Sequence, residues 1–72
     1  DKGDPESFRK LLDILDVSAG ECTLFDDSVK SCRSAKSVGM KVVGVYDPLF
    51  HDTREEMRLV CDRYIESFQE IL

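Results

Sequence analysis

Apolar residues recur three or four positions apart in the first part of the chain, which is the period of a helix. This stripe consists of Phe8, Leu11, Leu12 and Leu15. Asp4 suits the cap of the helix and Pro5 its first position, and the pattern predicts that it ends near Asp16. Ser18 and Glu21 then have capping-box spacing, which predicts one further helical turn.

The same period predicts two later helices. The inner face of the first consists of Val29, Cys32, Ala35 and Val38. Gly39 follows it, in the place where a left-handed glycine commonly ends a helix. The second is expected to start near Asp52 and Glu55, and its buried side consists of Met57, Val60 and Cys61. Residues 67–70 predict a final cap at the end of the chain.

Short apolar runs between these helices predict three strands, at 22–25, 41–45 and 64–66. The first two carry apolar residues at consecutive positions, as expected for parallel strands that are covered on both faces. The alternation of helices with strands predicts an α/β protein with a parallel sheet. Because three such strands make a poor independent domain, we expect residues 1–72 to be the carboxyl-terminal portion of a larger α/β core.

Composition and charge argue against several classes of function. The net charge of −5 disfavours nucleic acid as a partner, because phosphate backbones select basic surfaces. No apolar stretch approaches the roughly 20 residues that cross a bilayer, and no signal-peptide pattern is present, so we expect a cytoplasmic protein that does not bind membranes. Cys22, Cys32 and Cys61 are odd in number and lack metal-site spacing, which predicts reduced core thiols. His51 is interpreted as a loop residue.

Asp26 and Asp27 come directly after the first predicted strand, and a helix begins at once. Ligands of open α/β sheets bind at the carboxyl ends of the strands. Neighbouring carboxylates repel each other, and a hard cation such as Mg²⁺ would relieve that repulsion. Asp27 is also suited to cap the following helix. Tyr46 and Asp47 follow the next strand and could line the same site, although turn formation explains Asp47 equally well.

Four blocks of the sequence, taken in order, resemble the haloacid dehalogenase-like hydrolases. The closest branch is that of the phosphatases and phosphomutases similar to β-phosphoglucomutase. The blocks are residues 2–8, 25–28, 35–40 and 42–45. The resemblance implies a Rossmann-like, three-layer sandwich with a cap domain. It also implies phosphoryl transfer through an aspartyl-phosphate, assisted by Mg²⁺.

The resemblance further implies that Lys2 is the catalytic lysine that contacts phosphate, and that Asp26 and Asp27 bind Mg²⁺ with Ser28 orienting them. Gly3 departs from the family, which commonly has Pro there. The nucleophile motif and the cap are not in this chain, so we expect the chain to be inactive alone. Its implied partners are a small phosphorylated metabolite and the remainder of the core and cap. A phosphatase, a phosphomutase and a non-catalytic module that binds a cation or a partner are the alternatives.

Overall fold

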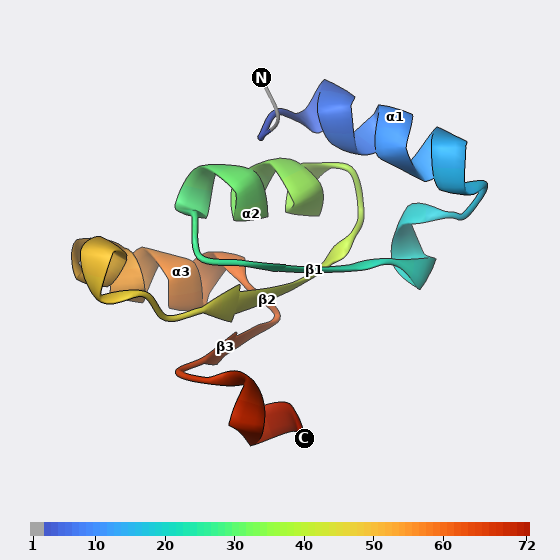
Figure 1. Cartoon of the computed structure of the whole chain (residues 1–72). Coiled ribbons are helices and arrows are strands. Elements are labelled where there is room, and N and C mark those ends of the chain that lie inside the picture. Colours follow the sequence, from blue (N-terminus) through green and yellow to red (C-terminus); the bar gives the residue numbers. More distant parts are fainter. Residues whose placement is uncertain (1–2) are drawn as a thin grey trace.

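The helices and strands alternate as the apolar pattern predicts. A computed structural model describes residues 3–72, in which three parallel strands are connected by helices (Figure 1). The elements are α1 (Pro5–Leu15), η1 (Ala19–Glu21), β1 (Thr23–Asp26), α2 (Val29–Ser37), β2 (Lys41–Val45), η2 (Pro48–Thr53), α3 (Arg54–Val60), β3 (Arg63–Ile65) and η3 (Phe68–Ile71). The predicted α/β class is therefore confirmed. Lys2 lies outside the described residues.

The ends of α1 and α2 follow the capping residues in the sequence. The Asp4 carboxylate accepts a hydrogen bond from the backbone N–H of Ser7 at 2.8 Å, and Pro5 opens the helix. Asp16 ends α1 with φ 56°, in the left-handed region. Gly39 follows α2 with φ 92°, where the absence of a side chain removes the steric cost. The predicted limits of both helices are therefore correct to within a residue or two.

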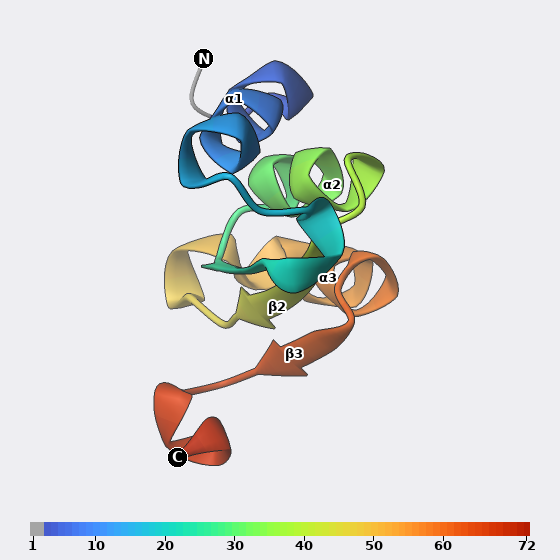
Figure 2. The same ribbon diagram turned by 90° about the vertical axis from the view of Figure 1, so that its right-hand side faces the viewer.

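The sheet order is β1-β2-β3, so each strand neighbours the next one in the sequence. Right-handed crossovers between such neighbours place α2 and α3 on the same face of the sheet. The core lies between that face and the helices, and α1 contacts α2 (Figure 2). Its buried members are Phe8, Leu12, Cys32, Ala35, Met40, Val42, Met57 and Cys61. Both views place α1 and η3 at opposite ends of the molecule.

Within the described residues, helices of the core cover only one face of the first two strands, and coverage of the second face by the remainder of a larger core stays a prediction. Leu24 and Val42 pack in the core, whereas Phe25 is 43% exposed and Val43 is partly exposed. Within residues 3–72, no α-helix packs on the second face of the sheet, which is partly covered by the short 3₁₀ helix η3. The ring of Phe68 from η3 lies 6.0 Å from that of Phe25.

One other expectation needs correction. Leu11 and Leu15 are 44% and 54% exposed, because only one side of α1 contacts α2. The third helix begins at Arg54, between Asp52 and Glu55 as expected, and residues 48–53 before it form η2. The Asp47 carboxylate caps η2 by accepting the N–H of Leu49 at 2.9 Å. Within residues 3–72, no helix is both long and apolar enough to cross a bilayer.

Candidate metal site

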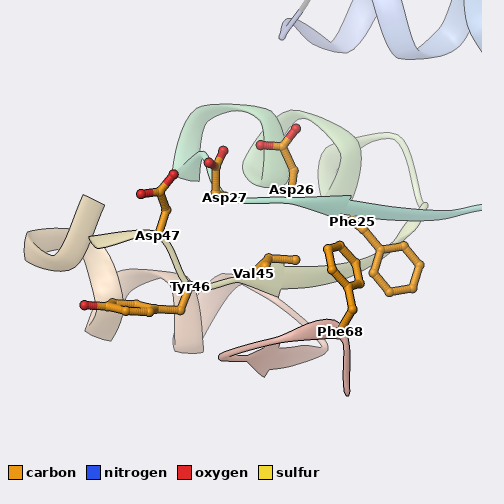
Figure 3. Close-up of a pocket in the computed structure, with 7 residues that line it drawn as sticks. All are labelled: Phe25, Asp26, Asp27, Val45, Tyr46, Asp47 and Phe68. Atoms are coloured by element: carbon orange, nitrogen blue, oxygen red, sulfur yellow. The ribbon is translucent and has the colours of Figure 1, made fainter. Parts of the chain in front are cut away.

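The acidic pair lies at the carboxyl edge of the sheet. Asp26 is the last residue of β1, and Asp27 lies between β1 and α2. Because β2 runs parallel to β1, Asp47 follows the neighbouring strand at the same edge. These residues line a cavity of about 310 Å³ (Figure 3). Its full lining is Phe25, Asp26, Asp27, Val45, Tyr46, Asp47 and Phe68.

Asp26 is oriented by the start of α2. Its Oδ1 accepts a hydrogen bond from the backbone N–H of Ser28 at 2.8 Å. The Oγ of Ser28 in turn accepts the N–H of Ser31 at 3.4 Å and caps the helix. The cap is therefore Ser28, and the alternative in which Asp27 caps α2 is wrong. The contact is made by the backbone N–H and reaches Asp26 alone, so the role of Ser28 in orienting both carboxylates stays a prediction.

Asp27 has the most perturbed carboxyl group of the cavity. Partial burial raises its pKa above the ordinary value, and a hydrogen bond with the Asp47 side chain and the charge of Asp26 raise the pKa further. Figure 3 shows the three carboxylates pointing to the same side of the strand ends. The neighbouring carboxyl groups therefore disfavour the ionised form of Asp27, since like charges oppose one another. A bound cation would relieve the same repulsion.

The donor set fits a hard cation with few protein ligands. Carboxylate oxygens suit Mg²⁺, which keeps several waters and takes one or two carboxylates alongside phosphate oxygens. Asp26 and Asp27 meet that requirement as adjacent residues. Across residues 3–72, no group of three or more His, Cys, Asp or Glu side chains is arranged to hold a metal ion.

The side chains of Phe25 and Phe68 lie away from the carboxylates. Figure 3 shows both rings on the other side of β1 from the three Asp carboxylates. Tyr46 turns outward, where the Arg54 guanidinium lies 4.9 Å from the centre of its ring. The sequence pattern did not place Phe68 at this edge. No local signal could do so, because its neighbour Phe25 belongs to the first strand of the sheet.

The remaining chemically active side chains are elsewhere. His51 is exposed, and its Nδ1 lies 3.2 Å from the carbonyl oxygen of Pro48, but it belongs to η2 and not to a loop as predicted. The three cysteines are free thiols, as predicted. Cys32 and Cys61 are buried in the core, and burial raises the pKa of both. Such thiols are poor nucleophiles.

The fold and the cavity define a class: an α/β protein with a carboxylate-lined site at the carboxyl edge of a parallel sheet. Comparison with known proteins goes no further, since no family model, no curated protein and no solved structure matches the chain. The likeness to the haloacid dehalogenase-like hydrolases therefore stays a prediction from the sequence blocks.

Proposed function

We propose that this chain is the portion of a Mg²⁺-dependent phosphatase, of the haloacid dehalogenase-like kind, that supplies the metal-binding carboxylates. Asp26 and Asp27 would hold the cation, and Lys2 would contact the phosphoryl group. The reaction would hydrolyse a small phosphorylated metabolite through an aspartyl-phosphate formed on the remainder of the core. A cap supplied by that remainder would select the substrate.

The observation that carries the proposal is the placement of the acidic pair at the carboxyl edge of a parallel sheet. Phosphoryl transfer needs positioning and charge neutralisation more than covalent help from the protein. When bound, Mg²⁺ supplies that neutralisation. The chain contributes a fixed carboxylate in Asp26, which Ser28 orients, and a second carboxylate in Asp27, whose neighbours disfavour its uncompensated charge. Both features support a site that is prepared for a cation.

Two alternatives share this site. A phosphomutase would return the phosphoryl group to a sugar instead of passing it to water, and the cap would decide between the two outcomes. A non-catalytic module would use Asp26 and Asp27 only to bind a cation or a partner. A D-x-D motif after a strand elsewhere in the full-length protein would support the enzyme, and its absence would favour the module.

Cation binding is tested on the 72-residue chain itself. Titration with Mg²⁺, followed by NMR of the backbone amides, should shift residues 26–28 and 45–47 together. Asp27→Asn should weaken binding by about tenfold or more, the scale on which changes at a metal site act. Asp13→Asn removes the same charge from an exposed position of α1 and should leave the affinity nearly unchanged. Equal affinities for the two variants would contradict the assignment.

Phosphatase assays should give different results for the 72-residue chain and for the full-length protein. The 72-residue chain should not hydrolyse p-nitrophenyl phosphate in the presence of Mg²⁺, because its nucleophile is expected elsewhere. Robust turnover by this chain would contradict its being one part of the catalytic core. In the full-length protein, Asp27→Asn should strongly reduce Mg²⁺-dependent hydrolysis while circular dichroism shows an intact fold. Unchanged hydrolysis by that variant would contradict the role of Asp27.

A further inference from the structure

The outer edge of β1 is a surface that the proposed function does not use. Among residues 3–72, β2 is the only strand hydrogen-bonded to β1. The N–H of Lys41 donates to the carbonyl oxygen of Cys22 at 3.1 Å, so that carbonyl faces β2. Backbone groups alternate in direction along a strand, so those of Thr23 and Phe25 face away from β2. These outward groups can pair with another strand.

The sequence of β1 does not protect this edge against pairing. Exposed edges of natural sheets commonly carry Lys, Pro or a bulge, and β1 is Thr-Leu-Phe-Asp. At the opposite edge of the sheet, β3 is followed by η3, and the guanidinium of Arg63 donates to the carbonyl oxygen of Glu70 at 3.3 Å. β1 therefore has the composition of an inner strand of a wider sheet.

The layer of helices indicates the side on which the sheet continues. α2 connects β1 to β2, α3 connects β2 to β3, and both helices pack in the same core. α2 contacts both α1 and α3. Figures 1 and 2 both show the helices in the order α1, α2, α3, which follows the direction of the strands β1, β2, β3. α1 therefore takes the next place in the helix layer, beyond the free edge of β1.

The hand of the crossovers leads to the same side. Connections between parallel strands through a helix are almost always right-handed. Crossovers of one hand, with their helices on one face, all move along the sheet in one direction. α1 leads into β1 from the face that α2 and α3 occupy, so a strand that precedes α1 lies on the free side of β1. A position beyond β3 would require a left-handed crossover.

α1 carries apolar side chains that suit such a neighbour. Phe8 and Leu12 are buried in the core, whereas Leu11 and Leu15 are 44% and 54% exposed. These two leucines extend the apolar stripe of α1 past the surface that α2 covers. A strand along the free edge of β1 gives this part of α1 a surface to pack against.

We propose that the free edge of β1 pairs with a parallel strand supplied by the part of the protein that precedes α1. Because that strand lies inside the sheet, it should carry apolar residues at consecutive positions. Parallel strands end at the same edge, so the loop that follows it borders Asp26 on the side opposite Asp47. This inference goes beyond the proposed function and requires neither a bound cation nor catalysis.

Hydrogen exchange, measured by NMR in the 72-residue chain and in the full-length protein, tests the pairing. The amide of Phe25 should exchange ~tenfold or more slowly in the full-length protein, because pairing closes an exposed strand amide. The amide of Leu24, which faces β2, should be protected in both. Equal exchange of Phe25 in the two proteins would overturn the inference. Protection in the full-length protein that is lost on dilution would also overturn it, because another molecule would then cover the edge.

Nuclear Overhauser contacts in the full-length protein test the direction of the added strand. Contacts from Phe25 to residues that precede α1, without close contacts between the two sets of Hα atoms, would support a parallel pair. Close Hα–Hα contacts would show an antiparallel pair and overturn the inference. This measurement decides the question even if the 72-residue chain does not fold alone.

A pair of variants tests the place of α1 above the added strand. Leu11→Asp should lower the urea midpoint of the full-length protein more than that of the 72-residue chain, because only the former has a strand against Leu11. Leu59→Asp is the matched control, since Leu59 is 87% exposed on α3 and the change in charge is the same. It should affect the two proteins equally. If Leu11→Asp does not fold, Leu11→Ala repeats the comparison, and equal losses in the two proteins would contradict the inference.

Discussion

The side chains of Asp27 and Asp47 line the same cavity, although the two residues follow different strands of the sheet. They are brought together because parallel β1 and β2 end at the same edge. After burial, the Asp47 side chain is the next cause that raises the pKa of Asp27. The contact gives the candidate site a dependence on pH that can be measured without any substrate.

The first prediction concerns Asp47→Asn, which should have opposite effects on folding and on cation binding. Because folding raises the pKa of Asp27, its protonated form contributes favourably to the free energy of unfolding. That contribution is complete below pH 3.8, the ordinary pKa, and is lost as the pH rises through the pKa of Asp27 in the folded chain. An amide at position 47 donates to ionised Asp27, so the variant should be more stable at pH 7. The gain should be about 0.5 kcal/mol or less because solvent screens the pair.

The same variant removes a negative charge beside the cation, so Mg²⁺ affinity should fall. Urea unfolding at pH 3 and pH 7, together with Mg²⁺ titration, checks both effects. Asp52→Asn is the control, since Asp52 is exposed in η2 and does not line the cavity. A loss of stability at pH 7 on Asp47→Asn would contradict the assigned role of the Asp27–Asp47 contact.

The second prediction concerns acid unfolding and Asp62. The carboxylate of Asp62 pairs with Lys36 and accepts the backbone N–H of Val42 at 2.8 Å, and these contacts lower its pKa. The ionised carboxylate of Asp62 therefore contributes favourably to the free energy of unfolding. That contribution is complete above pH 3.8, the ordinary pKa, and is lost as the pH falls through the lowered pKa of Asp62 in the folded chain. Asp62→Asn should remove most of that acid dependence.

Asp62→Ala should be more destabilising than Asp62→Asn at pH 7. The alanine leaves the partly buried N–H of Val42 without its side-chain acceptor, whereas the asparagine carbonyl can replace it. Thermal unfolding of both variants, measured side by side, checks this order. Equal melting temperatures would show that the N–H of Val42 does not depend on residue 62.

The sequence predicted the parts of the fold that depend on local chemistry. Asp4, Pro5 and Gly39 mark the ends of helices by their own conformational preferences, and the structure uses all three as expected. The adjacency of Asp26 and Asp27 at a strand end was likewise visible in the sequence. These features need no knowledge of what packs against them.

The parts that were missed depend on contacts between distant residues. Leu11 and Leu15 have the spacing of a buried stripe, but their exposure depends on how much of α1 reaches α2. Phe25 contacts Phe68 of another element, and Asp27 has Asp47 of another strand end as its neighbour. Helix and strand periodicity cannot supply such pairings, so the neighbours of the acidic pair had to come from the structure.

The third prediction concerns the reactivity of the three thiols. Cys32 and Cys61 are buried, and desolvation raises the pKa of each, so little thiolate is available. Cys22 is partly exposed. At pH 8, iodoacetamide should therefore modify Cys22 first, and the other two only after urea unfolds the chain. Peptide mass spectrometry at timed intervals checks the order, and rapid labelling of Cys32 in the folded chain would contradict the described core.

The last prediction concerns the close approach of β2 to α3 at Gly44. A Cβ there would lie 2.7 Å from Cys61 Sγ, 2.8 Å from Met57 Cε and 2.9 Å from Tyr64 Cδ1. Met57 is 1% exposed and cannot move outward without disturbing the core. Gly44→Ala should therefore cost about 1–3 kcal/mol in the free energy of unfolding, as overpacking of a core does.

Gly20→Ala is the matched control, because no atom lies within 4 Å of the position its Cβ would take. It should leave stability unchanged or raise it by up to about 1 kcal/mol, since alanine reduces the entropy of the unfolded chain. Adding Cys61→Ala to Gly44→Ala removes the nearest clashing atom, so the double variant should lose less than the sum of the single losses. Urea unfolding of the unmodified chain, Gly44→Ala, Cys61→Ala and the double variant measures that coupling. Strict additivity would show that the Cys61 sulfur is not what excludes a side chain at position 44.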